Sequence, residues 1–185
     1  MKILSRKPEQ LMKYDRVIKD QLDKGSIETV DQSEKIQPCH QIHYLPYHWG
    51  LREDKSTTKL RIVYNASARK NGTALNDCLH TGPPLTSDTL AILIRFRVQS
   101  IALVADIEKA FFMIAVNKED RDALRFLWVD DVNLAEPKIV EYRFARVVFR
   151  VISSPFFLMQ HFSSTSLALK GKTLNLSLGC FARFM

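Results

Sequence analysis

The sequence predicts an α+β fold in which helices pack beside antiparallel strands. Three observations predict it. Apolar residues recur at helical spacing over residues 8–25, a hairpin pattern covers residues 43–64, and two strand patterns flank an acidic turn within residues 125–144. Of the 185 residues, 46% are hydrophobic and 25% are charged, so the chain can form one folded domain or part of a larger one.

The first region, residues 1–35, is predicted to hold a helix and a short strand. Pro8 and Glu9 suit the first turn of a helix, and Gly25 suits its end. Between them, apolar residues recur every three or four positions, at Leu11, Tyr14, Ile18 and Leu22. The segment Ile27–Val30 is predicted to follow as a strand.

The second region, residues 36–100, contains the predicted hairpin. Residues 43–51 form one arm, residues 59–64 form the other, and the polar stretch 52–58 forms the tip. Residues 52–70 hold six basic and two acidic side chains. This composition suits phosphate binding, because guanidinium groups match phosphate oxygens, but a solvated charged hairpin has the same composition.

A loop and a helix complete the second region. The turn-forming pairs Asn71-Gly72 and Gly82-Pro83 predict a loop over residues 71–86. Ser87 is suited to cap a helix that follows it. The apolar residues of that helix are Leu90, Leu93, Ile94 and Val98.

The third region, residues 101–170, is predicted to begin with a buried central strand. The apolar run Ile101–Ala105 ends at Asp106, and Phe111–Val116 is the predicted partner strand. A carboxylate at the end of a buried strand needs a cation or hydrogen-bond donors, and Mg²⁺ prefers such oxygen ligands. A capping or salt-bridged aspartate is the alternative interpretation.

The remaining elements follow from local patterns. Residues 117–124 are polar and favour a helix, whereas residues 125–129 and 139–144 favour two strands around an Asp130-Asp131 turn. Ser153-Ser154-Pro155 is typical of a helix start, and that helix is predicted to run to about Leu169. Residues 171–185 form an atypical tail without a clear pattern.

The net charge of +7 favours a polyanionic partner, with nucleic acid the first candidate and an anionic membrane surface the second; an ordinary basic protein is the alternative. The three cysteines predict no disulfide framework. The chain shows no signal peptide and no apolar stretch long enough for a membrane span, so we expect a cytoplasmic protein that is not secreted. Cys39, His40, His43 and His48 are close in sequence, but their spacing favours loop and strand residues over a metal site.

The segment ADIEKAFF, residues 105–112, resembles the first catalytic motif of reverse transcriptases. Further segments, in order along the chain, are similar to the polymerases of BEL/Pao-type LTR retrotransposons. They are YLPYH (44–48), REDK (52–55), TKLRIVYNASA (58–68), LNDCL (75–79), TGPPL (81–85), EDRD (119–122), LRFLW (124–128) and YRFARVVF (142–149). The resemblance covers about residues 10 to 165.

The resemblance implies polymerase fingers over residues 36–100 and a partial palm over residues 101–170, acting on a nucleic-acid template with its primer and on deoxynucleoside triphosphates. Asp106 would bind catalytic Mg²⁺ or Mn²⁺. The other implied nucleotide-binding residues are Arg61, Lys55 and Lys59 of the hairpin, together with Ile107, Glu108 and Phe111. Phe149, Ser154 and Pro155 would lie near the template and primer, and Phe111 would exclude a 2′-hydroxyl.

The resemblance also implies that part of the family's catalytic site is missing from these 185 residues. Two-metal nucleotidyl transfer needs several carboxylates, and the Asp-Asp pair of the family is expected beyond the helix that Ser154 opens. Asp130-Asp131 comes too early to be that pair. Relatives have aspartate, glycine and asparagine where Asn65, Arg150 and Ile152 stand here. We therefore expect a truncated polymerase fragment of a retrotransposon polyprotein that is inactive alone. A non-catalytic nucleic-acid-binding remnant and a non-functional translated fossil are the alternatives.

Overall fold

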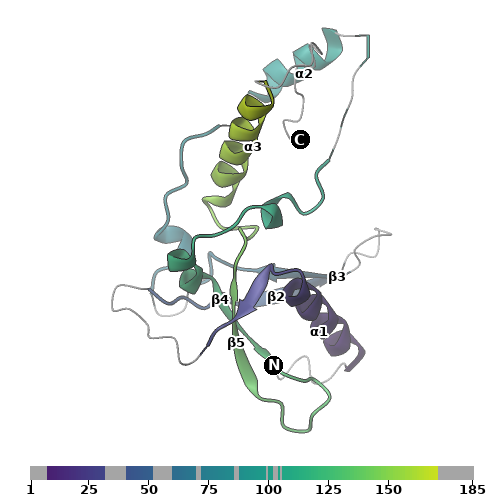
Figure 1. Ribbon diagram of the computed structural model, residues 1–185, viewed down its shortest axis with the longest axis vertical. Coiled ribbons are helices and arrows are strands. Elements are labelled where there is room, and N and C mark those ends of the chain that lie inside the picture. Colours follow the sequence, from purple (N-terminus) through teal and green to yellow (C-terminus); the bar gives the residue numbers. More distant parts are fainter. Residues whose placement is uncertain are drawn as a thin grey trace.

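The computed structural model describes residues 8–31, 41–51, 60–69, 72–85, 88–98, 100–101, 104 and 106–170. Helices and small antiparallel sheets make up the fold, which confirms the α+β prediction (Figure 1). In chain order the elements are α1 Pro8–Asp23, β1 Ile27–Thr29, β2 Tyr47–Leu51, β3 Leu60–Tyr64, η2 Leu75–Asp77, α2 Thr89–Val98, η3 Ala110–Met113, η4 Lys118–Leu124, β4 Arg125–Val129, β5 Ile139–Phe144 and α3 Ser154–Lys170, where η marks a 3₁₀ helix.

The larger sheet has the strand order β1-β5-β4, and both pairings are antiparallel. The predicted acidic turn joins β4 to β5: Asp130 Oδ1 accepts hydrogen bonds from the backbone N–H groups of Asp131 at 2.7 Å and Lys138 at 3.0 Å. The strands 125–129 and 139–144 form where the sequence predicts them, because this local turn joins two runs rich in apolar and aromatic residues.

Helix α1 covers the larger sheet through its apolar stripe. Tyr14 and Ile18 are almost fully buried, and the Tyr14 ring stacks on the Trp128 ring with centroids 5.8 Å apart. The indole Nε1–H of Trp128 donates a hydrogen bond to Asp15 Oδ1 at 3.1 Å. Without this bond the buried N–H group would have no hydrogen-bond partner. Gly25, with a φ of +63°, follows the end of the helix, and Ser26 connects it to β1.

The hairpin of β2 and β3 packs against the larger sheet through aromatic rings. Tyr64 lies 4.7 Å from Phe144 and 5.1 Å from Phe126, measured between ring centroids. The Tyr47 hydroxyl donates to the Leu127 carbonyl at 2.7 Å, and burial raises the pKa of Tyr47 to about 12. The first arm starts later than predicted, at Tyr47, because Tyr44 instead forms a bridge with Arg125 at the edge of the sheet. The predicted tip, residues 52–58, lies outside the described residues.

A network of ion pairs joins η4, β1, β4 and β5. Asp122 Oδ1 accepts from Arg125 Nη2 at 2.9 Å and from Arg143 Nη1 at 2.9 Å. Arg143 Nε also donates to Glu28 Oε1 at 2.6 Å, and Arg125 Nη1 donates to Glu141 Oε2 at 3.0 Å. These guanidinium groups tie the strands of the larger sheet to η4, through the local pair of Arg125 with Asp122 and through pairs between residues distant in sequence.

The predicted partner strand, residues 111–116, is wrong. It starts as the 3₁₀ helix η3, and among the described residues it pairs only at an isolated bridge between Ala115 and Arg146. Most of the predicted central strand lies outside the described residues, because Ala102, Leu103 and Ala105 are not described. Its two described apolar members, Ile101 and Val104, are 78% and 71% exposed and belong to no strand, so the predicted burial is wrong for these two residues.

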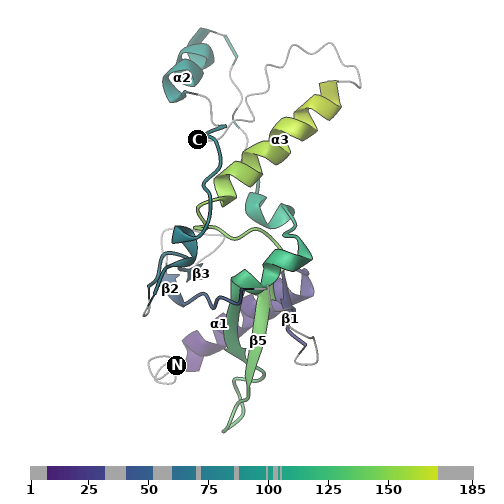
Figure 2. The same cartoon turned by 90° about the vertical axis from the view of Figure 1, so that its left-hand side faces the viewer.

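The predicted packing of helices holds for α1 and for the first turns of α3, where Leu158 and Met159 are buried, but not for α2. No described residue of α2 is buried, and Leu90, Leu93, Ile94 and Val98 are all exposed. Helices α2 and α3 lie at the end of the molecule away from the sheets (Figures 1 and 2). The predicted cap Ser87 lies outside the described residues.

Among the helices that the structure describes, none combines the length and the apolar character that a bilayer crossing requires.

Candidate functional site

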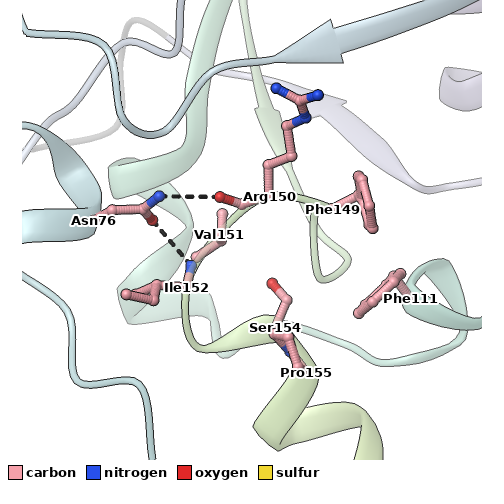
Figure 3. A pocket seen from close by; sticks show the side chains of 8 residues that line it. All are labelled: Asn76, Phe111, Phe149, Arg150, Val151, Ile152, Ser154 and Pro155. Atoms are coloured by element: carbon pink, nitrogen blue, oxygen red, sulfur yellow. Dashed lines mark hydrogen bonds between the residues drawn. The ribbon is translucent and has the colours of Figure 1, made fainter.

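A pocket of about 350 Å³ lies at the N-terminal end of α3 (Figure 3). Four parts of the chain line it: η2, η3, the turn that follows β5, and the first residues of α3. The lining residues are Asn76, Phe111, Phe149, Arg150, Val151, Ile152, Ser154 and Pro155. Four of them, Phe111, Phe149, Ser154 and Pro155, are site residues that the sequence predicts.

Two phenylalanines form the aromatic wall of the pocket. The rings of Phe111 and Phe149 lie 5.5 Å apart at an angle of 60°, and Figure 3 shows them facing each other. Phe149 is 64% exposed, an unusual amount for a phenylalanine. Phe111 is placed by η3, which begins after Lys109 in a left-handed conformation with a φ of +53°. Exposed aromatic rings beside a pocket suit contact with a flat or apolar part of a ligand.

Asn76 holds the turn at the back of the pocket, and its role was missed from the sequence. Its Nδ2 donates to the Arg150 carbonyl at 3.0 Å and to Ser67 Oγ at 2.8 Å, while its Oδ1 accepts from the Ile152 N–H at 2.9 Å. Figure 3 shows both contacts of the amide with the turn. The asparagine of the LNDCL segment was the available signal, because an amide can donate and accept at once.

Arg150 has a φ of +74°, a conformation that favours glycine. Arginine at this position therefore places a strained residue in this turn. Asn65, the second departure, accepts a hydrogen bond from the Ser67 N–H at 3.1 Å and so caps a local turn. Ile152, the third, lines the pocket with a partly exposed side chain.

Ser154 fixes the opposite side of the same turn. It is 1% exposed, and its hydroxyl donates to the Val148 carbonyl at 2.6 Å. Its backbone N–H donates to the Val151 carbonyl at 3.0 Å. Pro155 occupies the first turn of α3, where the missing N–H of proline is tolerated. Ser154 thus holds the pocket wall in place and has no free hydroxyl hydrogen for a ligand.

The structure does not bring the predicted metal ligand into a cluster. Asp106 is exposed, and its Oδ1 accepts a hydrogen bond from the adjacent Ile107 N–H at 3.0 Å. Glu108 is 88% exposed at its side chain and lies 3.8 Å from Lys109 Nζ. Within the described residues, no three His, Cys, Asp or Glu side chains come together in a way that could hold a metal ion. Asp106 on its own does not provide the set of carboxylates that two catalytic cations require.

Arg61, the predicted cationic residue of the hairpin that the structure describes, does not line the pocket. Arg61 lies on β3, where its side chain is exposed and forms no ion pair with any described residue. Lys55 and Lys59 lie outside the described residues. Ile107 is 38% exposed and, like Asp106 and Glu108, does not line the pocket.

The histidine pattern of the second region forms no described metal site. His48 is exposed on β2, whereas His43 is half-buried and its Nε2 has no hydrogen-bond partner among the described residues. Burial lowers the pKa of His43, which favours the neutral ring. Cys39 and His40 lie outside the described residues.

Comparison of the sequence with protein-family models and with curated proteins finds no match.

Proposed function

We propose that this chain is a reverse-transcriptase-like segment of a retrotransposon polyprotein, which contacts a nucleic-acid template with its primer and a deoxynucleoside triphosphate. One observation carries the proposal beyond the motif series. Phe111 and Phe149, far apart in sequence, meet with Ser154 and Pro155 around a single pocket. Those four residues were selected from motif resemblance alone, so their convergence supports the proposal.

The chemistry of the pocket suits part of a nucleotide. Its aromatic wall offers an apolar surface on which a sugar or a base could rest, and a 2′-hydroxyl placed against the Phe111 ring would find no hydrogen-bond partner there. Arg61, exposed on β3, is a candidate for the phosphates. In the intact family, bound Mg²⁺ or Mn²⁺ activates the attacking hydroxyl and neutralises the charge of the triphosphate. Asp106 would contribute one of the carboxylates for that purpose.

We propose further that these 185 residues bind without catalysing. A single exposed carboxylate does not offset the mutual repulsion of two dications, and Asp130 and Asp131 are engaged in the β4–β5 turn. The expected location is the cytoplasm, within a retroelement particle and beside other domains of the polyprotein.

A primer-extension assay tests the proposal. The purified chain is mixed with a primed RNA template, the four deoxynucleotides and Mg²⁺ or Mn²⁺, and binding of template-primer is measured in parallel by fluorescence anisotropy. We expect binding without extension. Extension that Asp106→Ala abolishes would show that the chain is an active polymerase, whereas the absence of both binding and extension would contradict the proposed family role.

A second candidate function is a non-catalytic nucleic-acid-binding remnant that uses the basic hairpin. The exposed, unpaired state of Arg61 among the described residues favours it, because an uncompensated cation attracts phosphate groups. The remnant would bind nucleic acid with strong salt dependence but would not bind deoxynucleotides. Titration with deoxynucleotides alone therefore separates the two candidates.

A further inference from the structure

Arg150 adopts a backbone conformation that an arginine normally avoids. Its φ of +74° lies in the left-handed region, and Lys109 is the one other non-glycine residue with a positive φ in the described part of the chain. Such outliers are costly and persist only where the surroundings impose them. A glycine would satisfy this turn without strain, so the side chain of residue 150 is the feature that needs explaining.

The surroundings do impose the conformation. The Asn76 side chain binds the turn on both sides of Val151, through the Arg150 carbonyl and the Ile152 N–H. From the other side, the Ser154 hydroxyl binds the Val148 carbonyl, and the Ser154 N–H binds the Val151 carbonyl. The turn therefore cannot relax by shifting in either direction, and the position of the Arg150 Cα is fixed.

The guanidinium of Arg150 is the uncommitted polar group of the pocket lining. Asn76 and Ser154, the other polar side chains there, are both engaged with the turn. Arg150 is exposed, and its side chain makes no hydrogen bond or ion pair with any described residue. Figure 3 shows it extending from the turn away from Ser154 and Pro155, while Phe149, its neighbour in sequence, faces Phe111.

We propose that Arg150 binds a phosphate group of a nucleic-acid strand that passes the rim of this pocket. An exposed guanidinium without an internal partner, carried on a backbone turn that is held from both sides, suits a phosphate because its planar donors match two phosphate oxygens. The strand is favoured over a free nucleotide because the guanidinium is directed away from the pocket residues Ser154 and Pro155. The inference rests on the proposed function, and it assigns a contact to a position where similar polymerases carry glycine.

The test separates strain from binding with three variants of the full chain. Arg150→Gly removes both the strain and the charge, Arg150→Gln removes the charge alone, and Arg150→Lys keeps the charge. Arg16→Gln, an exposed cation on α1, is the matched control for net charge. Each protein is titrated with a fluorescein-labelled oligodeoxythymidylate, with a primed RNA template and with a free deoxynucleoside triphosphate over a range of salt concentrations, and its Tm is recorded.

Arg150→Gly is expected to change stability and affinity in opposite directions. Its Tm should rise by about 2 °C because the left-handed strain is relieved. Its affinity for both oligonucleotides should fall about fivefold, with a shallower salt dependence. Arg150→Gln should show the same loss of affinity without the rise in Tm. Arg16→Gln should stay within about twofold of the unchanged chain. Arg150→Lys should fall between that control and Arg150→Gln, because lysine keeps the charge but not the planar pair of donors.

Two results would overturn the assignment. If Arg150→Gly raises the Tm while oligonucleotide affinity stays the same, Arg150 is only strained, and the proposed function stands without it. If the variants lose affinity for a free deoxynucleoside triphosphate but not for the oligonucleotides, the phosphate belongs to the nucleotide and not to a strand. An unchanged chain that binds none of these probes would refute this inference together with the proposed function.

Discussion

The sheet end of the molecule and the α2 end are held by different amounts of buried surface. Around the sheet, aromatic side chains from α1, β2, β3, β4 and β5 bury one another, and Phe126, Phe144 and Trp128 are at most 1% exposed. Helix α2 has no described buried residue, and Val98 is 72% exposed. Sequence periodicity identified both regions equally well. It does not say whether a partner surface exists for the apolar face.

The same contrast between buried and exposed regions appears in two short apolar runs of the chain. Arg125–Val129 and Ile101–Ala105 both end at an aspartate, and both were predicted as strands. The first is paired with β5 through a turn that Asp130 closes, and four of its five residues are buried. In the second, the two described apolar residues, Ile101 and Val104, are exposed and belong to no strand. A uniformly apolar strand requires cover on both faces, and these two residues do not have it.

The largest expected effect is the loss of a core ring. Phe144→Ala should lower the free energy of unfolding by about 4 kcal/mol, because the ring is fully buried against Tyr64 and Phe126 and its removal leaves a cavity. Urea denaturation followed by circular dichroism measures it. Ile94→Ala on α2 is the matched control and should change stability by less than about 0.5 kcal/mol. Equal losses for both would show that α2 is packed as tightly as the sheet.

The ion-pair network at the sheet is expected to have the next largest effect. Asp122→Asn removes the carboxylate that faces Arg125 and Arg143, and the side chain of Arg125 is only 5% exposed. Leaving two poorly solvated cations together should lower the free energy of unfolding by about 3 kcal/mol at pH 7. The variant Glu136→Gln, in the exposed β4–β5 connection, is the control and should be neutral.

The same network predicts a pH dependence with a definite sign. Burial alone would raise the pKa of Asp122, but the hydrogen bonds and charges of Arg143 and Arg125 outweigh it and hold that pKa below its ordinary value. A lowered pKa stabilises the folded chain above the unfolded value, near 4, and that stability is lost as the pH falls through the lowered pKa. The stability difference between the unchanged chain and Asp122→Asn should therefore narrow below about pH 4. A difference that stays constant down to pH 2 would contradict this.

Local signals predicted most of the sheet and about half of the site. Turn residues, caps and alternation placed α1, β1, the hairpin, β4, β5 and α3, because each depends on neighbours in sequence. Phe111 and Phe149 were predicted through motif resemblance, and the structure brings them together. The role of Asn76 was missed, because the segment offered only an amide that can donate and accept, and its two backbone partners lie in a turn distant in sequence. The predicted burial of Ile101 and Val104 was wrong, because burial depends on the surroundings of a residue and not on its own apolar character.

A smaller effect is expected at the pocket wall, between the two ends. Ser154→Ala removes the hydroxyl that binds the Val148 carbonyl and leaves that buried acceptor without its partner. The free energy of unfolding should fall by about 2 kcal/mol. Ser153→Ala, one residue earlier and more exposed, is the control and should cost about 0.5 kcal/mol or less. A Ser154→Ala variant as stable as the control would show that the turn is held by Asn76 alone.

The smallest effect on folding, and the sharpest test of the comparison, comes from α2 itself. Leu90 and Ile94 are 64% and 56% exposed, and an exposed apolar face promotes association between molecules. Replacing both with glutamine preserves helix propensity better than serine or threonine would, so the Tm should shift by less than about 1 °C while light scattering at high concentration decreases. The corresponding change at the sheet, Phe126→Gln, should unfold the chain, because a fully buried ring is replaced by an amide without partners. If the α2 double variant instead lowered the Tm by several degrees, the helix would have to bury its apolar face in solution, and the contrast between the two ends would be wrong.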